Sequence, residues 1–443
     1  MVRIGPMASP ESELDRRKLM AGLGAAALAP VWPARALAQG RSSSPALAAS
    51  LALKAAPERL KWRPDGPETS AWGLSGSDLS SRRGATAEVS IGNGLQVPLA
   101  LHWRGVDGNN ATEPLLARPP IAAGASEAFR LTFRHAGTFL CDPGLLGDGQ
   151  AQPSRSKPLL VLESETIPVD RDEVLLIEEW RLRPDGTAIA PGLDAKDTKP
   201  LYTLNGQTSF ELTALRNQRL RLRFINGSQR TVVALKLENH EVRVMAIDGQ
   251  PAEPFPARNG ALVLAPGSRI DAFVDTATTA SIVLHDGKEA HTIGKLTISG
   301  SLERRAPLLP APPLPSNGLP AQLDLKNAQR FDLALGAPPD WARPADFKAA
   351  ATPAFRARAG RVVVLALTNR AAIATVFHLH GHHFRLLDRL DDGWKPFWLD
   401  TLAIEPGQTQ RIAFLAEYSG RWLIESVATD WAAPRLVRWY AVE

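Results

Sequence analysis

The sequence predicts an all-β chain that is divided into several β-sandwich domains. Short apolar runs bounded by turn residues recur along the chain, whereas helical periodicity is nearly absent after the N-terminal segment. The 36 prolines and 34 glycines cut the sequence into short segments, which favours strands joined by turns. A chain of 443 residues also exceeds what one hydrophobic core usually supports, so we expect two or three domains.

The predicted strands fall into three groups along the chain. They are 87–93, 97–103, 128–134 and 158–164, then 173–180, 220–226, 241–247, 261–266 and 269–275, and finally 361–369, 409–417 and 436–442. Their spacing is typical of β-sandwiches. A phrase made of an apolar strand, a Pro or Ala, a Gly turn and a second apolar strand occurs once in each group, at 119–133, 262–274 and 402–414. One structural unit used three times explains the repetition.

Two stretches of distinct composition separate the groups. Residues 163–173 are polar, and residues 302–322 are rich in proline and are expected to form an extended linker over the surface. We therefore predict domains at 45–164, 165–302 and 323–443, with the Pro-rich linker at 303–322. Each predicted domain has a size suited to a single sandwich.

The N-terminal segment, residues 1–38, has the features of an export signal. The pair Arg16-Arg17 precedes a mild apolar run from Leu19 to Val31, and Ala36-Leu37-Ala38 forms a cleavage pattern of small residues. The arginine pair predicts a twin-arginine (Tat) signal and a periplasmic protein. A disordered tail with a chance arginine pair is the alternative. No other segment is apolar for the roughly 18 residues that span a bilayer, so no transmembrane segment is expected.

The distribution of charge and the number of cysteines limit the partners and the disulfide bonds that we expect. The net charge of +5 is spread along the chain rather than clustered, which argues against a nucleic-acid-binding protein. The single cysteine, Cys141, cannot form an intramolecular disulfide. It follows an apolar run at 137–140, so a buried thiol is favoured over an intermolecular link.

The stretch ATVFHLHGHHFRLL, residues 374–387, contains four of the nine histidines of the chain in an otherwise apolar context. These histidines are His378, His380, His382 and His383. Side chains two residues apart on a strand point to the same face, so His378 and His380 can act together. No other part of the chain resembles a metal site so closely.

Four motifs around these and other residues resemble the copper-binding motifs of the three-domain multicopper oxidases. They are LHWRGV (101–106), HAGTFLCDPG (135–144), TVFHLH (375–380) and GRWLIESVATDW (420–431). The resemblance covers essentially residues 50–443. It implies three cupredoxin-like Greek-key β-sandwich domains, with metal ligands contributed by the first and the third.

The chain departs from the family at most of the positions that the resemblance assigns to copper ligands. An oxidase of this family needs a mononuclear copper held by a cysteine thiolate and histidines, and a trinuclear cluster held by further histidines. At the corresponding positions this sequence has Arg104, Asp142, Gly144, Thr375, Glu425, Ser426, Val427 and Trp431. We therefore expect none or one copper and not the full set of four. No catalytic residue is assigned.

Three family histidines remain, namely His102, His378 and His380. The resemblance implies that His102 and His378 correspond to ligands of the lone copper of the cluster, and His380 to a ligand of the neighbouring pair. One interpretation is a residual copper or zinc site completed by water and by Asp142 or Glu425. The other is that these histidines hydrogen-bond across the interface between the first and third domains.

Arg104 favours the second interpretation, because a guanidinium beside Asp142 and Glu425 would pair with those carboxylates. The histidines outside this set carry no metal-site pattern. His382 and His383 are expected to be structural or exposed, and no role is assigned to His135, His240, His285 and His291.

Two functional hypotheses follow from these residues. The first is an exported, non-catalytic structural or interaction protein of the cell envelope, monomeric and with an unknown protein partner. It is similar to copper-free, Tat-exported members of the family that stabilise the division machinery. The second is a copper-binding protein or a reduced oxidoreductase that uses His102, His378 and His380.

The first prediction concerns export. Conversion of both Arg16 and Arg17 to lysine should leave the precursor in the cytoplasm, because the Tat pathway recognises this pair. Cell fractionation and immunoblotting measure the outcome. Continued export of the double-lysine form would assign the segment to the general secretory route.

Overall fold

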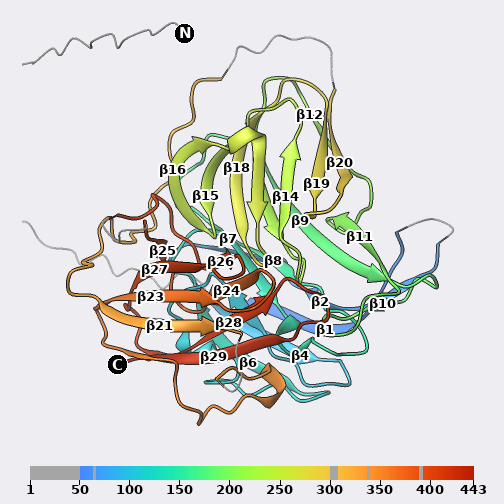
Figure 1. The fold of residues 1–443 in the computed structure, drawn as a ribbon. Helices are drawn as coiled ribbons and strands as arrows, with labels where there is room; N and C mark the ends of the chain where they lie inside the picture. Colours follow the sequence, from blue (N-terminus) through green and yellow to red (C-terminus); the bar gives the residue numbers. More distant parts are fainter. Residues whose placement is uncertain (1–49, 63–65, 300–307, 337–339, 389–392) are drawn as a thin grey trace, which may run out of the picture. The chain divides into compact units, whose positions relative to one another are not determined.

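The computed structural model describes residues 50–62, 66–299, 308–336, 340–388 and 393–443. Figure 1 shows that the strands follow one another through the chain as a blue-to-cyan group, a green-to-yellow group and an orange-to-red group. Within the described residues they pair into six sheets, two for each group. The export signal expected at residues 1–38 lies outside the described residues.

The first sandwich consists of two four-stranded sheets. One has the order β2 (Thr69–Gly76), β1 (Ser50–Leu60), β4 (Thr86–Asn93) and β6 (Ser126–Thr132). The other has the order β3 (Leu79–Arg82), β8 (Lys157–Leu162), β7 (Gly137–Asp142) and β5 (His102–Arg104). Apolar side chains of both sheets, Val89 and Phe139 among them, form a single buried core.

The second sandwich packs a seven-stranded sheet against a five-stranded one. The larger sheet has the order β10 (Ala188–Ile189), β9 (Arg171–Leu182), β13 (Arg219–Asn226), β18 (Arg269–Asp275), β15 (Arg243–Ile247) and β16 (Gln250–Pro256), with β11 (Lys199–Leu204) also paired to β9. The smaller has the order β12 (Phe210–Ala214), β20 (Ala290–Ile298), β19 (Ala280–His285), β14 (Val233–Leu237) and β17 (Ala261–Leu264).

The third sandwich again joins two sheets around one core. The first has the order β21 (Gln329–Leu335), β23 (Val362–Asn369), β27 (Thr409–Leu415) and β25 (Arg385–Leu386). The second has the order β22 (Arg356–Ala357), β29 (Arg435–Val442), β28 (Gly420–Ala428), β24 (Thr375–Leu379) and β26 (Thr401–Ile404). Four 3-10 turns complete the described secondary structure: η1 (Asn110–Thr112), η2 (Gly144–Leu146), η3 (Arg258–Gly260) and η4 (Pro344–Asp346).

The all-β fold class with cupredoxin-like sandwiches is confirmed, while the strand prediction is wrong at 97–103 and misses several strands, such as β1, β2, β14 and β20. The strand expected at 97–103 is reduced to β5, because Pro98 has no N–H to donate and Leu99 makes only an isolated bridge with Ile121. Strand β1 was not predicted, although it alternates buried and exposed residues and joins β2 to β4. The described residues belong to one compact unit, and the three domain boundaries stay predictions.

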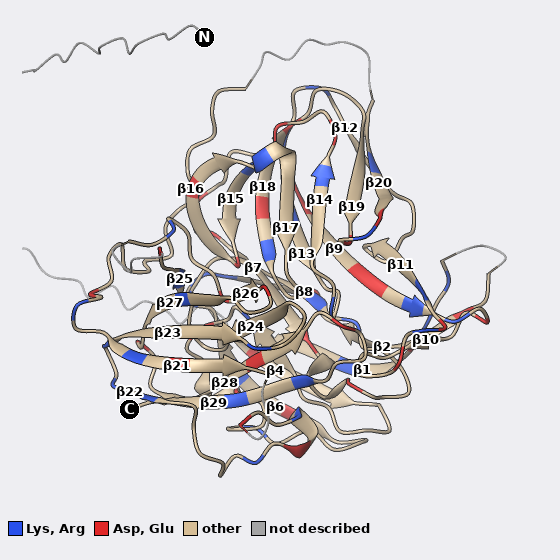
Figure 2. Ribbon diagram, viewed as in Figure 1, with Lys and Arg blue, Asp and Glu red and all other residues tan. Residues whose placement is uncertain are grey.

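Charged residues are interspersed over the strands and loops rather than gathered on one part of the fold (Figure 2). Cys141 is free and buried in the first sandwich, as expected. Among the described residues, no helix is long and apolar enough to cross a membrane.

The described part of the Pro-rich segment, residues 308–322, forms neither strand nor helix. It does not lie wholly on the surface, because the side chains of Leu314 and Asn317 are buried. Leu314 packs against an apolar group of the second sandwich that includes Phe273. The segment is therefore anchored to the fold at these two residues.

The end of β24 depends on a glycine. Gly381 follows His380 with φ of 75°, and a Cβ at this position would overlap the ring of Trp422, which is buried in the core of the third sandwich. Only glycine combines this backbone conformation with so close an approach.

Gly381→Ala should therefore destabilise the protein by more than the cost of the backbone conformation, which is about 1–3 kcal/mol. Gly360→Ala is the matched control, since Gly360 has φ of 73° but a Cβ added there would have no neighbouring atom within 4 Å. Chemical unfolding of both variants measures the difference. Equal losses would mean that Trp422 moves aside without cost.

Candidate functional site

The candidate site lies where the first and third sandwiches meet. Within the third, β24 pairs with β28 so that His378 stands opposite Glu425. Within the first, β5 pairs with β7 so that His102 stands opposite Asp142. Two strand pairs from distant parts of the sequence thus present their polar side chains to the same interior space.

Three imidazoles meet in this space. The rings of His102 and His380 stack with their centroids 3.6 Å apart and their planes 1° from parallel. The centroid of the His378 ring lies 5.0 Å from each of the other two. All three side chains are buried. The structure therefore brings together the three histidines that the sequence singled out, and metal binding by them stays a prediction.

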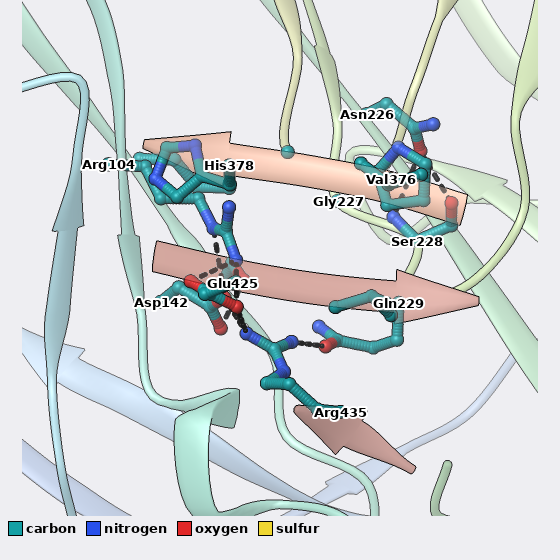
Figure 3. A pocket seen from close by; sticks show the side chains of 15 residues that line it. Arg104, Asp142, Asn226, Gly227, Ser228, Gln229, Val376, His378, Glu425 and Arg435 are labelled. Carbon is teal, nitrogen blue, oxygen red and sulfur yellow. Dashed lines mark hydrogen bonds and ion pairs between the residues drawn. The ribbon is translucent and has the colours of Figure 1, made fainter. Parts of the chain in front are cut away.

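A cluster of buried ion pairs lies close to His378 (Figure 3). The Nε of Arg104 donates to Asp142 Oδ2 at 3.2 Å, and its Nη2 donates to Glu425 Oε1 at 3.0 Å. Arg435 donates from Nη1 to Glu425 Oε2 at 2.7 Å and lies 3.6 Å from Asp142 Oδ2. Two guanidinium groups therefore face two carboxylates, and the charges of the cluster balance. The expected pairing of Arg104 with both acids is present.

The cluster continues into the second sandwich. The Nη2 of Arg435 donates to Gln229 Oε1 at 2.8 Å. Arg230, from the same loop as Gln229, donates to both carboxylate oxygens of Asp148 at 2.7 Å. Asp148 in turn accepts a hydrogen bond from the backbone N–H of Arg435. These bonds tie the interface of all three sandwiches to one set of paired charges.

The environment fixes the charge of each acid. Burial alone would raise the pKa of Glu425, but the positive charges of Arg104 and Arg435 hold that pKa well below its usual value. Burial opposes ionisation of Asp142 in the same way, and Arg435 and Arg104 again lower its pKa. Both acids are therefore ionised at neutral pH and depend on their guanidinium partners.

The three histidines differ in protonation. His380 contacts a carboxylate at each ring nitrogen: Nδ1 lies 2.7 Å from Glu113 Oε1, and Nε2 lies 3.0 Å from Glu425 Oε1. Both partners only accept hydrogen bonds, so both nitrogens donate and the ring is an imidazolium. Burial would lower the pKa of His380, but Glu113 and Glu425 raise it above its usual value.

The other two imidazoles are neutral. Burial lowers the pKa of His378 to about 4, and the charge of Arg104 adds to this effect. Burial also holds the pKa of His102 well below its usual value, with the charge on His380 contributing. The Nδ1 of His378 lies 3.0 Å from the backbone oxygen of Asp400, which places the lone pair on Nε2.

The donor atoms decide which metal the site can hold. The Nε2 of His378 is buried and has no hydrogen-bond partner, whereas the Nδ1 of His102 faces a carboxylate oxygen, Glu425 Oε1, at 3.3 Å. His378 Nε2 and the other ring nitrogen of His102 would fit at most a single metal ion. His380 offers no lone pair while both of its nitrogens donate, and Glu425 is already held by two guanidinium groups. The residues present do not fit a trinuclear cluster.

The positions that the resemblance assigns to a mononuclear copper have other contacts. The hydroxyl of Thr375 lies 3.2 Å from Asn369 Oδ1, and the indole N–H of Trp431 donates to the backbone oxygen of Ala190 at 3.0 Å. Ser426 is buried and its hydroxyl has no partner. Among the described residues, neither group of potential metal donors contains Cys141. These side chains offer no thiolate, so they do not fit a blue copper centre.

Sequence patterns missed several residues of the site. Glu113 and Arg435 carry no motif signal, yet they hold His380 and Glu425. His382 and His383 are both buried, so of the two alternatives expected for them the exposed one is wrong. His135, to which no role was assigned, lies with Asp107 and His383 in a second group of potential metal donors.

The buried pairing of Arg104 gives a direct test. Arg104→Ala should destabilise the protein by on the order of 3 kcal/mol, because it leaves the buried Glu425 and Asp142 short of a partner. Arg130→Ala is the control, since its pair with Glu88 has side chains that are 77% and 61% exposed and should contribute less than about 1 kcal/mol. Urea unfolding at neutral pH measures both. Similar losses for the two variants would show that water reaches Arg104.

The sequence is similar to proteins of a known family. Residues 322–443 and 171–284 each match a family model described as multicopper oxidase. The multicopper oxidase MmcO of Mycobacterium tuberculosis is 24% identical over 400 residues, which cover 76% of this chain and 75% of that protein. Laccase-3 of Thanatephorus cucumeris is 25% identical over 248 residues, which cover 48% of this chain and 43% of that protein.

Solved structures agree with the sequence matches. A multi-copper oxidase from Pseudomonas thermotolerans superposes with a TM-score of 0.77 at 25% identity, covering 90% of this chain and 100% of that one. Lac15 from a marine microbial metagenome gives a TM-score of 0.74 at 24% identity, covering 89% and 100%. The two matching segments together span more than half of the sequence, and both structures share its fold. The chain belongs to the multicopper oxidase family.

Proposed function

We propose that this chain is a member of the family in which ion pairs fill the space of the copper cluster, and that it acts without oxidase chemistry. The observation that carries the proposal is Arg104, which stands at a position assigned to a copper ligand and binds both Asp142 and Glu425. A guanidinium has no lone pair for a metal and stays protonated at physiological pH. It supplies locally the positive charge that copper would bring.

The side chains at the position of the mononuclear copper, through which electrons would enter, support the same proposal. Oxidases of this family take electrons through a copper held by a thiolate, and the side chains of Thr375, Ser426 and Trp431 cannot supply one. The thiol of Cys141 is no substitute, because it is buried in the core of the first sandwich and its burial raises its pKa. The named relatives are oxidases and laccases, so the proposal separates this chain from them by its side chains and not by its fold.

Export and an envelope partner belong to the proposal as well. The twin-arginine segment supports a periplasmic location, and a fold without redox chemistry is suited to a structural or interaction role, which includes stabilisation of the division machinery. The partner would be another protein of the cell envelope.

A second function, binding of one copper or zinc ion, is favoured by a specific observation. The Nε2 of the neutral His378 ring is buried without a partner, and His378 belongs with His102 to one group of potential metal donors. A buried lone pair without a hydrogen bond is costly, and a metal ion would satisfy it. Such an ion would supply Lewis acidity or one-electron chemistry, while Asp400 would keep His378 oriented through its backbone oxygen.

The absorption spectrum and oxygen uptake of the copper-loaded protein test the proposed function. We expect no intense visible band and no oxygen consumption with phenols or ferrous iron, because no thiolate is available to copper. A laccase loaded in parallel is the positive control. An intense band after loading would show that residues 420–431 hold a copper ligand and would contradict the proposal.

Metal stoichiometry separates the two functions. Arg104→His removes the competing charge and adds an imidazole, so it should bind copper more tightly than the wild type. If the second function holds, the wild type should bind one equivalent that is lost in His102→Ala and in His378→Ala but kept in His285→Ala, whose side chain is exposed. Retention of the metal by all three variants would place it elsewhere.

A further inference from the structure

A second buried group of histidines and acids lies apart from the copper-type cavity. It consists of Asp107, which follows β5, His135, which precedes β7, and His383, which follows β24. The Nδ1 of His383 lies 2.6 Å from Asp107 Oδ2, and the Nδ1 of His135 lies 3.4 Å from the same oxygen. By composition the group resembles a three-ligand metal site. Its hydrogen bonds indicate instead that the ring of His383 is protonated on both nitrogens.

Both ring nitrogens of His383 face acceptors. Its Nδ1 meets the Asp107 carboxylate, and its Nε2 lies 2.8 Å from the backbone oxygen of Asp248. A carboxylate and a carbonyl oxygen can only accept, so both nitrogens of His383 must donate. The ring is then an imidazolium, and its bonds join the first sandwich to the second through a residue of the third.

Asn317, from the Pro-rich segment, fixes the orientation of the neighbouring amide. The backbone N–H of Ala136 donates to Asn317 Oδ1 at 2.9 Å, and Asn317 Nδ2 donates back to the Ala136 carbonyl at 2.8 Å. This double contact allows only one orientation of the Asn317 amide. Its Nδ2 also donates to Gln250 Oε1 at 3.0 Å, so the Gln250 oxygen must face Asn317.

The orientation of Gln250 determines the proton on His135. With its oxygen turned to Asn317, Gln250 points its NH2 group at His135 Nδ1, 3.0 Å away. That nitrogen must therefore accept, which leaves His135 neutral with its proton on Nε2. The Nε2 of Gln250 also lies 3.4 Å from His383 Nδ1, but that nitrogen already donates to Asp107, so the two donors form no hydrogen bond. A hydrogen of the Gln250 amide therefore faces His135 Nδ1, and His383 Nδ1 carries a proton. Neither nitrogen has a lone pair left for a metal ion.

The remaining charges around His383 are already paired. Asp400 Oδ2 lies 3.7 Å from His383 Nε2, but it is held by Arg269 Nη2 at 2.6 Å. The carboxylate of Asp248 accepts the backbone N–H groups of Arg269 and Asp400. The adjacent His382 is neutral, because burial lowers its pKa to about 4. Asp107 is therefore the acid that balances the charge of His383.

We propose that His383 is an imidazolium at neutral pH that locks the three sandwiches together, and that Asn317 of the Pro-rich segment sets the tautomer of His135 beside it. The group is a proton-dependent clamp and does not bind a metal. Burial lowers the pKa of His383, but the Asp107 carboxylate outweighs this effect and raises it to about 9. The inference is independent of the proposed function, because it involves none of the cluster residues.

The sign of the pH dependence follows from this shift. An unfolded histidine has a pKa of about 6.5, so the folded state binds the proton more tightly. The stability that His383 contributes is fully present below about pH 6.5 and is lost as the pH rises toward 9. A metal site of the same residues would behave in the opposite way, because ligand deprotonation at higher pH favours the metal.

Thermal unfolding of wild type and His383→Gln between pH 6 and 10 tests the clamp. The difference in Tm should be largest near pH 6 and should shrink as the pH approaches 9. His285→Gln is the control, since its exposed side chain should leave Tm unchanged throughout. A difference that stays constant with pH, or a rise in the wild-type Tm on addition of Zn²⁺ that His383→Gln abolishes, would overturn the proposal.

NMR of the 15N-histidine-labelled wild type gives an independent readout if the variant does not fold. We expect an imidazolium signal that persists at pH 8 in addition to that of His380, and a neutral His135 protonated on Nε2. Asn317→Asp should reverse the Gln250 amide, because two oxygens would otherwise face each other, and should move the His135 proton to Nδ1. A neutral His383 at pH 8, or an unchanged His135 tautomer in Asn317→Asp, would contradict the assignment.

Discussion

The contact on which the interior of this protein depends is the ion pair between Arg104 and Glu425. It joins β5 of the first sandwich to β28 of the third, and both side chains are almost completely buried. A buried charge is tolerated only when it is paired and hydrogen-bonded, so each charged side chain of the network needs a buried partner. This requirement is met by Asp142, which accepts from Arg104, and by Arg435, which donates to Glu425 and to Gln229. The result is a balanced network where the family places copper.

The same requirement explains the unequal histidines. His380 lies between Glu113 and Glu425 and is a positively charged imidazolium, whereas His102 and His378 face Arg104 and stay neutral. A cavity that held several copper ions would need all three rings as lone-pair donors. In the proposed function the guanidinium groups of Arg104 and Arg435 supply the positive charge that a metal would bring, and among the described residues His378 Nε2 keeps a buried lone pair without a partner.

The fold and part of the site could be predicted from the sequence, because both rest on local patterns. Short alternating strands predicted the sandwiches, and the resemblance of the motifs to those of the family implied that His102, His378 and His380 would converge and that Arg104 would meet Asp142 and Glu425. Glu113, Arg435 and the clamp around His383 could not be predicted. Asn317, for example, contacts Ala136 from 181 residues away, and such a contact depends on how the sandwiches pack and not on any local pattern.

X-ray anomalous scattering at the copper edge, from crystals grown with excess copper, tests the central claim most directly. If ion pairs fill the cluster space, the map should show no group of copper peaks between His102, His378 and His380, and Arg104 should remain within hydrogen-bond distance of Glu425. At most one peak, between His102 and His378, is compatible with this account. Two or more peaks in that space, with Arg104 displaced, would contradict it.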